Sequence, residues 1–311
     1  MAKILTVTFN PVIDKSTTIP ALIPEKKLRC SAPKFEPGGG GINVARAIKK
    51  LGGEATALYL AGGYTGVFLN ELLKREGVTT QPLEINRHTR ENLIVLDTST
   101  NQQYRFGMPG PEITEAEWQA CLQVIEDEEG LEYIVASGSL PSGVPTDIYA
   151  RIAAIARRRK AKLVVDTSGE ALQQAAREGV YLLKPNLAEL SSLVGKEEIH
   201  AELVDDVARE IIDKGECEIV VTSLGPLGAM LVTHEDVVTI TPPVVRKRST
   251  VGAGDSMVAG MVLCLSNGWT IAEAAKYGVA AGTAATMNPG TELCRRHDVE
   301  KLYKLIHSKR G

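Results

Sequence analysis

Short apolar runs alternate with longer amphipathic segments along most of the chain. The runs are rich in β-branched residues and have the length of buried strands, and they lie at Ile4–Phe9, Ala55–Ala61, Tyr133–Ser137, Leu163–Val165, Val180–Leu183 and Ile219–Ser223. Apolar positions recur at helical spacing in Ile42–Leu51, Val67–Arg75, Glu115–Glu126, Asp147–Arg158, Val204–Asp213, Ser256–Leu265, Ile271–Met287 and Val299–His307. This alternation predicts an α/β fold, in which helices cover both faces of a mostly parallel sheet.

Two stretches interrupt this rhythm. Residues 12–33 and 87–107 show short alternating patterns, as in ENLIVLDTSTNQQYRF, where the triplet STN supplies a turn. These stretches predict a small antiparallel β appendage. A further hairpin is indicated by LGPLG, residues 224–228, which lies between two strand-like runs. Since no linker-like tract divides the chain, we expect residues 1–311 to form a single domain that carries the appendage.

The composition narrows the classes of function. Of the 311 residues, 44% are apolar and 23% are charged, which is ordinary for a globular protein. The net charge of −3 does not indicate a basic surface for nucleic acid, and no apolar segment is long enough for a membrane span. The five cysteines form no C-x-x-C pair and the N-terminus has no signal-peptide pattern, so we expect a reducing, cytoplasmic setting.

The segment TVGAGDS, residues 250–256, is a candidate site of chemistry. Small residues open a predicted helix, whose first amides are unpaired and whose dipole favours an anion. Gly252 and Gly254 would let a phosphate approach these amides, and Asp255 could accept a proton from a substrate hydroxyl. The alternative is an ordinary helix cap. The segment matches neither the Walker A pattern nor G-x-G-x-x-G, because Met257 stands at the third glycine position; a Rossmann-type dehydrogenase is therefore disfavoured.

Four glycines at residues 38–41 lead directly into the amphipathic segment that begins at Ile42. Each glycine loses much backbone entropy when it is ordered, so the run makes a poor structural element. One interpretation is a flexible connector. The other is a surface that a sugar can approach closely, with the Asn43 amide able to pair with its hydroxyls.

The segment KPNLAE, residues 184–189, offers an amide and a carboxylate. Asn186 and Glu189 stand three residues apart and therefore share a helix face. Such a pair suits a Mg²⁺ ion that keeps most of its water. An N-cap asparagine with a capping-box glutamate explains the same spacing, and from spacing alone it is the better explanation.

Other candidates are single residues. Asp14 could bind sugar hydroxyls or merely close a turn. Lys27, Arg29 and Arg90 fall in the predicted appendage and could meet a substrate phosphate, although exposed cations are common there. The segment SGSLP, residues 137–141, ends a strand at the ligand edge of the sheet, where a plain turn explains it equally well.

The order of these motifs resembles a known family. NPxxD, GGGGINVARA, SGSLP, KPNxxEL, SLGPLGA and STVGAGDSM follow one another across nearly the whole chain. This order resembles the ribokinase-like carbohydrate kinases, specifically their phosphofructokinase B branch. The resemblance implies a Rossmann-like α/β domain with a small β lid formed by residues 12–33 and 87–107. It also implies a homodimer, since lids in that family commonly pair between subunits.

The resemblance implies roles for individual residues. Asp255 matches the catalytic base, and the anion hole is matched by Gly252, Ala253 and Gly254. The positions that bind ATP are matched by Lys184, Asn186, Ser223, Gly225 and Gly228. The sugar site is matched by Asp14, Gly39, Gly40 and Asn43, and is extended by Arg90 and Ser139. Glu189 with Asn186 matches the element that organises Mg²⁺, and a loop for a monovalent cation such as K⁺ is matched by Ser249, Val251, Ala285, Asn288 and Gly290.

The glycine run and the lid indicate the substrate. Relatives that act on fructose 1-phosphate or tagatose 6-phosphate often carry GGKG, whereas this chain has GGGG. A phosphorylated sugar needs cationic partners, which Lys27 and Arg29 could supply from the lid. We therefore expect ATP-dependent phosphorylation of fructose 6-phosphate at O1. Activity on the other two sugar phosphates is an alternative, and a non-catalytic sugar-phosphate or nucleotide sensor is the alternative from another class.

Overall fold

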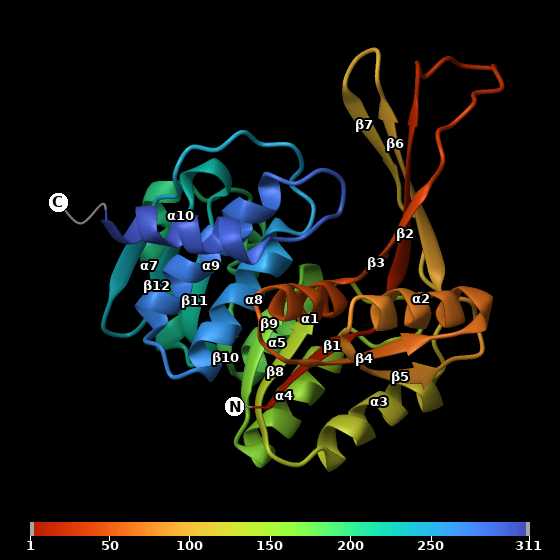
Figure 1. Ribbon diagram of the computed structural model, residues 1–311. Coiled ribbons are helices and arrows are strands. Elements are labelled where there is room, and N and C mark those ends of the chain that lie inside the picture. Colours follow the sequence, from red (N-terminus) through yellow and green to blue (C-terminus); the bar gives the residue numbers. More distant parts are fainter. Residues whose placement is uncertain (1–2, 309–311) are drawn as a thin grey trace.

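Within residues 3–308, which the computed structural model describes, nine strands form one large sheet (Figure 1). The strand order is β13-β12-β11-β10-β9-β8-β1-β4-β5. The strands are β1 Lys3–Thr8, β4 Thr56–Ala61, β5 Thr79–Glu84, β8 Leu131–Ser137, β9 Lys162–Asp166, β10 Val180–Leu183, β11 Cys217–Ser223, β12 Ala229–Val232 and β13 Val237–Ile240. Neighbouring strands are parallel except at β11–β12 and β12–β13, so the predicted mostly parallel sheet is confirmed.

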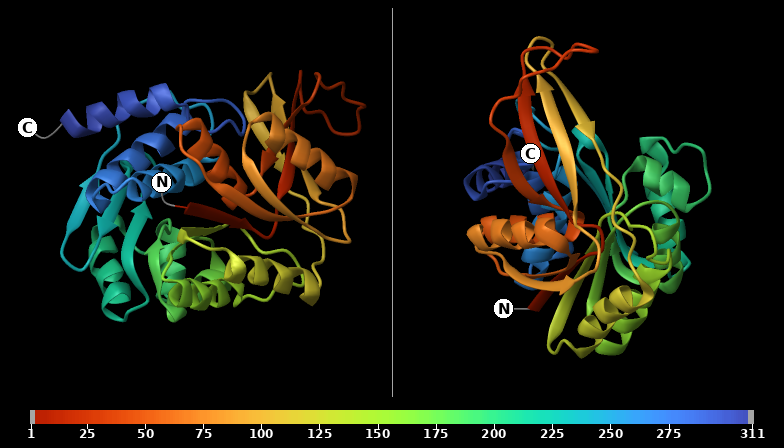
Figure 2. Two further views of the ribbon diagram at one scale, coloured as in Figure 1. Left: turned by 60° about the horizontal axis from the view of Figure 1, so that its bottom comes forward. Right: turned by 90° about the vertical axis from the view of Figure 1, so that its right-hand side faces the viewer.

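Helices cover both faces of this sheet, as the alternation predicts (Figure 2). One face packs against α1 Gly40–Lys50, α2 Gly63–Arg75, α8 Ala253–Ser266, α9 Ile271–Thr286 and α10 Arg296–Ser308. The other face packs against α3 Glu115–Asp127, α4 Ile148–Arg159, α5 Gly169–Glu178, α6 Leu187–Leu193 and α7 Val204–Asp213. Side chains alternate along β1, so Ile4 enters the first core while Leu5 and Val7 enter the second. Burial on both sides explains why these strands are almost continuously apolar.

Within residues 3–308, four further strands form a second sheet that stands away from the body (Figure 1). Its order is β3-β2-β6-β7, and the strands are β2 Val12–Ile19, β3 Lys34–Gly38, β6 Arg90–Asp97 and β7 Gln102–Phe106. The outer pairs are antiparallel, as predicted for the appendage, whereas the central pair of β2 and β6 is parallel. The cause is that β2 and β6 both leave the body and run outward, whereas β3 and β7 return.

The patterns do not predict β5, β13 or α5. β5 has the sequence TTQPLE, and as a half-exposed edge strand it lacks an apolar run. α5 packs mainly through alanines, which give only a weak apolar stripe. The helix predicted at Ser256–Leu265 begins earlier, at Ala253, so Gly254 and Asp255 lie in its first turn.

The position of β1 determines where a crevice opens. β1 lies between β4, to which the chain continues through α1, and β8, from which the sheet extends the other way. At such a reversal the connections on opposite faces leave a crevice beyond the carboxyl ends of the strands. The segments that follow β1 and β8 meet there, because Asn10 Nδ2 donates a 3.1 Å hydrogen bond to Ser139 Oγ. The second sheet rises from the same edge.

Candidate active site

The start of α8 leaves backbone amides available to a ligand. The residue before the helix is Gly252, whose φ of 72° is a left-handed conformation that favours glycine. Glycine has no side chain that could cap the first amides. The amides of Gly254 and Asp255 precede the first intrahelical bond of the turn, which Ser256 N donates to Gly252 O at 2.9 Å. This geometry favours a bound anion, as the segment predicts.

Asp255 lies in the first turn of α8 and contacts the helix that follows the glycine run. Its Oδ2 accepts a 2.9 Å hydrogen bond from Nδ2 of Asn43, although 212 positions separate the two residues in the sequence. The contact joins two motifs that the sequence presents separately, the expected anion hole and the expected sugar-binding helix.

The surroundings of Asp255 adjust its proton affinity. Burial, together with the negative charge of Asp166, raises the pKa of Asp255 to about 7. The hydrogen bond from Asn43 and the positive charges of Lys184 and Arg46 oppose this shift. A carboxyl group with a pKa near 7 suits general-base catalysis, because it is ionised near neutral pH and still binds a proton well.

Lys184 is buried beside the same helix start. Its Nζ lies 3.0 Å from Oδ1 of Asp166, the last residue of β9. Burial alone would lower the pKa of Lys184, but the Asp166 carboxylate raises it and keeps the lysine charged. A Cβ atom at Gly254 would lie 3.5 Å from the Lys184 Nζ, so this charge stands close to the anion hole. Asp166 is missing from the residues singled out by sequence, although its place at the end of a buried strand is a signal for it.

The glycine run is tightly packed, which argues against a flexible connector. Gly39 has a φ of 113°, and a Cβ atom at Gly40 would lie 2.3 Å from Ser137 Oγ. Ile42 N donates a 2.9 Å hydrogen bond to Thr8 Oγ1, which fixes the first turn of α1 against β1. Glycine is therefore required where α1 begins close to the ends of β1 and β8.

Asp14 lies at the foot of the second sheet. Its Oδ1 accepts a 3.1 Å hydrogen bond from Nδ2 of Asn92 on β6, a residue that the motifs do not single out. Burial raises the pKa of Asp14, while the hydrogen bond from Asn92 and the charge of Arg90 oppose the shift. Arg90 donates to the carbonyl oxygens of Met108 at 3.1 Å and Asn10 at 3.3 Å, which hold its guanidinium near Asp14.

A cavity of about 380 Å³ opens beside the anion hole. Ala253 and Gly254 line one side of it, and the predicted nucleotide residues Ser223, Gly225 and Gly228 line another. Gly225 begins the short 3-10 turn η2 Gly225–Leu227 that connects β11 to β12, where the hairpin was expected. The sequence analysis assigns no nucleotide-binding role to the rest of the lining, which is mainly apolar and includes Pro242, Pro243, Val244, Val245, Met257 and Val279. An apolar slot that ends at free amides suits a nucleotide, since the base is flat and the phosphates are anionic.

Asn186 and Glu189 form a capping box at the start of α6. Asn186 Oδ1 accepts from the Glu189 amide at 2.9 Å, and Glu189 Oε2 accepts from the Asn186 amide at 2.8 Å. The negative charges of Asp166, Glu189 and Asp255 all act on Lys184, and a divalent cation would offset this excess. Within residues 3–308, no three carboxylate, histidine or cysteine side chains are grouped as direct metal ligands. The residues thus fit a Mg²⁺ ion that is held mostly through water.

The residues expected to bind a monovalent cation come together in two adjoining segments. Ser249 Oγ donates to the Gly290 carbonyl at 2.7 Å and accepts from the Val251 amide at 3.2 Å. The Ala285 carbonyl accepts from the Asn288 amide at 3.1 Å, at the end of α9. Carbonyl and hydroxyl oxygens are suitable ligands for such a cation.

Lys27 and Arg29 do not join this site in their own chain. They lie in the exposed connection between β2 and β3, at the outer end of the second sheet (Figure 1). Because both strands extend away from the body, this connection is remote from α8. Within one chain, Arg90 is the predicted cation that lies near Asp14, and a contact of Lys27 or Arg29 with a substrate phosphate stays a prediction.

The chain is similar to known carbohydrate kinases over nearly its whole length. Residues 7–298 match the pfkB family carbohydrate kinases. The ATP-dependent 6-phosphofructokinase isozyme 2 of Escherichia coli (strain K12) is 47% identical over 308 residues, which cover 98% of this chain and 99% of that protein. The 1-phosphofructokinase of Bacillus subtilis (strain 168) is 32% identical, with 93% of this chain and 95% of that protein covered.

Solved structures agree with this result. Two crystal structures of phosphofructokinase-2 from Escherichia coli, one in complex with potassium and one with fructose-6-phosphate, have TM-scores of 0.95 and 0.93 to this chain. They are 46% and 44% identical to it, and each comparison covers 99% of this chain and 100% of the other. The resemblance carried by the ordered motifs is confirmed, and this chain belongs to the pfkB family of carbohydrate kinases.

Proposed function

We propose that this protein is a kinase that transfers the γ-phosphoryl group of ATP to O1 of fructose 6-phosphate and releases fructose 1,6-bisphosphate and ADP. The contact between Asp255 and Asn43 carries the proposal, because it puts a candidate base between the cavity that suits a nucleotide and the residues that suit a sugar. The relatives favour this acceptor, since the 6-phosphofructokinase is 47% identical and the 1-phosphofructokinase 32%.

The transfer would follow from the geometry around α8. Asp255 takes the proton of the O1 hydroxyl while O1 forms a bond to the γ-phosphorus and the bond from phosphorus to ADP breaks. The amides at the start of α8 and the nearby Lys184 offset the negative charge of the phosphoryl group. Mg²⁺ bound with ATP would supply further positive charge, and Asn186 and Glu189 are the residues proposed to hold it through water.

The sugar phosphate would lie between the glycine run and the foot of the second sheet. The proposed contacts to its hydroxyls come from the backbone or side chains of Asp14, Gly39, Gly40, Asn43 and Ser139. Arg90 is proposed to pair with the phosphate at C6, since a guanidinium can bind a phosphate through two parallel hydrogen bonds. Fructose 1-phosphate and tagatose 6-phosphate remain the alternative acceptors.

The second sheet is proposed to act as a lid and to pair with the lid of another copy. Leu22, Ile23, Phe106 and Met108 are between 40% and 48% exposed on it. Leu22 and Ile23 follow the outer end of β2, and Phe106 and Met108 lie at the inner end of β7; exposed apolar side chains along this sheet favour association. A lid over the crevice would also exclude water and limit wasteful hydrolysis of ATP. The mass of the protein in solution tests the homodimer.

Two further assignments are proposed for the setting of the enzyme. Among residues 3–308, no helix combines the length and apolar character that crossing a membrane requires, and a cytoplasmic location is proposed on the cysteine pattern. K⁺ is proposed to bind near Ser249 and Gly290, and the crystal structure of the relative in complex with potassium supports this.

A coupled assay for ADP release tests the proposed function. The substrates are fructose 6-phosphate, tagatose 6-phosphate, fructose 1-phosphate and free fructose, each with ATP and Mg²⁺. We expect the highest kcat/KM with fructose 6-phosphate, and a loss of at least about a hundredfold in kcat for Asp255→Asn at unchanged nucleotide affinity. Release with none of the sugar phosphates would favour the sensor, and near-normal turnover of Asp255→Asn would overturn its assignment as the base.

A further inference from the structure

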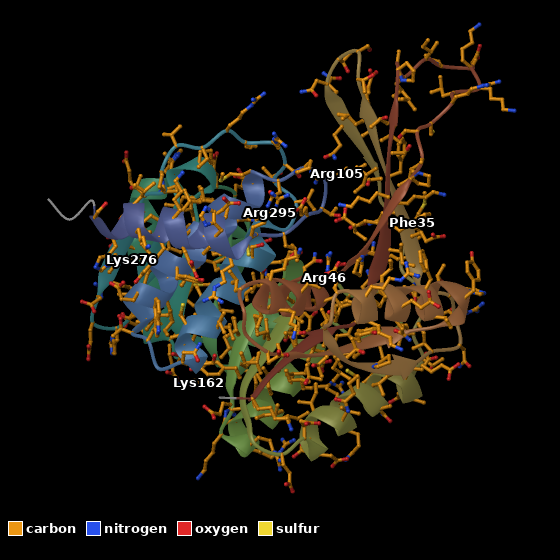
Figure 3. All side chains as sticks on the ribbon, in the orientation of Figure 1. Phe35, Arg46, Arg105, Lys162, Lys276 and Arg295 are labelled. Atoms are coloured by element: carbon orange, nitrogen blue, oxygen red, sulfur yellow. The ribbon has the colours of Figure 1, made fainter. Side chains whose placement is uncertain are left out.

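Arg46 is a buried cation behind the site, and although it belongs to the segment GGGGINVARA, no role has been assigned to it. It lies on α1 near the foot of the second sheet (Figure 3), and its side chain is 2% exposed. Its Nε and Nη2 donate to the two carboxylate oxygens of Glu76 at 2.8 and 2.6 Å, and its Nη1 donates to the Pro37 carbonyl at 2.6 Å. A buried charge is costly unless it is fully paired, so this guanidinium is held in one position.

The same guanidinium contacts the amide that contacts Asp255. Arg46 Nη1 donates to Asn43 Oδ1 at 3.2 Å, and Asn43 Nδ2 donates to Asp255 Oδ2 at 2.9 Å. Asn43 and Arg46 are three residues apart on α1, which brings the two side chains to one helix face. The chain of contacts therefore runs from Glu76 through Arg46 and Asn43 to Asp255.

An asparagine amide can point either of two ways, and the guanidinium selects one of them. The amide has an oxygen that only accepts and a nitrogen that only donates. In the reversed orientation the amide nitrogen would face the donating guanidinium, and the amide oxygen would face the Asp255 carboxylate. Both contacts would then be repulsive, so Arg46 determines that Asn43 presents its NH₂ group to Asp255.

We propose that Arg46 is a positioning residue for phosphoryl transfer, which fixes the Asn43 amide so that it engages Oδ2 of Asp255 and leaves Oδ1 to accept the substrate proton. This inference rests on the proposed role of Asp255 as the base. Arg46 itself makes no hydrogen bond to Asp255, yet the orientation and the ionisation of the Asp255 carboxylate would depend on it. Glu76, at the end of α2, holds Arg46 from the side away from the site.

The charges around Asp255 determine how its pKa should change when Arg46 is replaced. Asp166, at the end of β9, disfavours its ionised form, while Lys184 after β10 and Arg46 on α1 favour it. Removing Arg46 removes one positive charge and also frees the Asn43 amide to turn away. The negative charge of Asp166 then acts with less opposition, so the carboxylate should ionise at a higher pH.

The experiment is a pH profile of kcat/KM for wild type, Arg46→Met and Arg46→Lys. In Arg46→Met we expect a loss of about tenfold to a hundredfold at pH 7, an acid limb that moves up by about one pH unit, and partial recovery at pH 9. Arg46→Lys keeps the charge but cannot make the forked contact, so it should fall between the two. Nucleotide affinity, measured directly, should not change.

Lys276→Met is the matched control. Lys276 is another cation with a nearly buried side chain, 8% exposed, and its Nζ lies 2.6 Å from Glu273 Oε1 on α9. Figure 3 shows it well away from Arg46, on the side of the molecule near α10. If Arg46 were only structural, both variants would lower the unfolding temperature and neither would move the acid limb. A shift of the limb in Arg46→Met alone supports the proposal.

A second measurement separates this inference from the proposed function. The titration of the Asp255 carboxyl can be followed by infrared difference spectra against Asp255→Asn, without any turnover. An upward shift in Arg46→Met supports the positioning role, and an unchanged titration overturns it even if Asp255→Asn is inactive. If Arg46→Met does not fold, Arg46→Lys carries the test, since a lysine keeps a positive charge beside Glu76 but cannot contact Glu76, Pro37 and Asn43 at once. The same shift is expected there at smaller size, and its absence would refute the proposal.

Discussion

The helices α6 and α8 each carry a carboxylate in the first turn, but the two carboxylates make different contacts. At α6, Asn186 and Glu189 each accept a hydrogen bond from the other's backbone amide. At α8 the cap position is Gly252, which has no side chain, and the carboxylate of Asp255 accepts from Asn43 on another helix. The first helix start caps its own amides, whereas the second leaves the amides of Gly254 and Asp255 to a ligand.

The comparison indicates that a helix N-terminus can bind a ligand when no side chain caps its first backbone amides. A third start, at α3, is closed by Thr114 and Glu117 in the same way as α6. The charge of Glu189 acts on Lys184 beside α8, whereas Glu117 accepts a hydrogen bond from the Asn86 amide instead. The starts of α3 and α6 are therefore matched in chemistry and differ in distance from the proposed reaction, which makes α3 a control for α6.

Gly252→Ala should show the largest effect. A Cβ atom at this left-handed position is strained, and it would lie 2.5 Å from Leu293 Cδ2, so the first turn of α8 must shift. Loss of one well-placed anion-binding donor costs about 10²–10³-fold in kcat. We therefore expect at least about a hundredfold loss of kcat at saturating substrates, measured by ADP release.

Gly268→Ala is the control for Gly252→Ala. Gly268 follows the other end of α8 with a φ of 81°, and a Cβ atom there meets no described atom within 4 Å. The backbone strain is similar, so stability should fall by about 1 kcal/mol while kcat stays unchanged. Equal losses of kcat in the two variants would contradict the view that only the first end of α8 is built for a ligand.

Glu189→Gln should have the next largest effect, on the requirement for Mg²⁺. A glutamine can keep the cap but loses the charge, so the concentration of Mg²⁺ for half-maximal rate should rise by about tenfold or more. Glu117→Gln makes the same change in the capping box of α3 and should leave this concentration unchanged. Both variants should lose about 1 kcal/mol of stability or less. A Mg²⁺ requirement that moves equally in both would mean that Glu189 is only a cap.

Much of the fold could be predicted because burial imposes a period on the sequence. The run Ile219–Ser223 ends where β11 ends, and Val204–Asp213 coincides with α7. The direction of neighbouring strands is not encoded in this period, since alternation gives the faces of a strand but not its partner. That is why the parallel pairing of β2 with β6 could not be predicted from residues 12–33 and 87–107.

The candidate site was predictable as a set of motifs and not as a set of contacts. The residue types around Asp255 and Asn43 each indicate their own chemistry, but the hydrogen bond between them depends on how α1 and α8 pack. The pair of Asp166 and Lys184 depends on β9 lying beside β10, which the chain order does not reveal. Lys27 shows the reverse case, since its charge suits a phosphate but an extended hairpin carries it away from α8.

The smallest expected effect concerns stability, and it has opposite signs at two aspartates. Between about pH 4 and pH 7 the folded chain keeps a proton on Asp255 that the unfolded chain has released, because burial raises this pKa to about 7. Stability therefore falls as the pH rises through this window. Asp255→Asn cannot ionise, so it should unfold a few degrees above wild type at pH 8, and the difference should vanish near pH 4.

Asp97 provides the opposite case at the outer end of the second sheet. Hydrogen bonds from the Ser99 side chain and the Leu22 amide hold the pKa of Asp97 at about 2, so its ionised form stabilises the fold. That contribution is present above the unfolded pKa near 4 and is lost as the pH falls toward 2. Asp97→Asn should therefore unfold below wild type at pH 8, and the two curves should converge in acid. Asp255→Asn, by contrast, should be more stable than wild type at pH 8. If it were also less stable, ionisation of the buried Asp255 would not destabilise the fold, and the raised pKa of this residue would be contradicted.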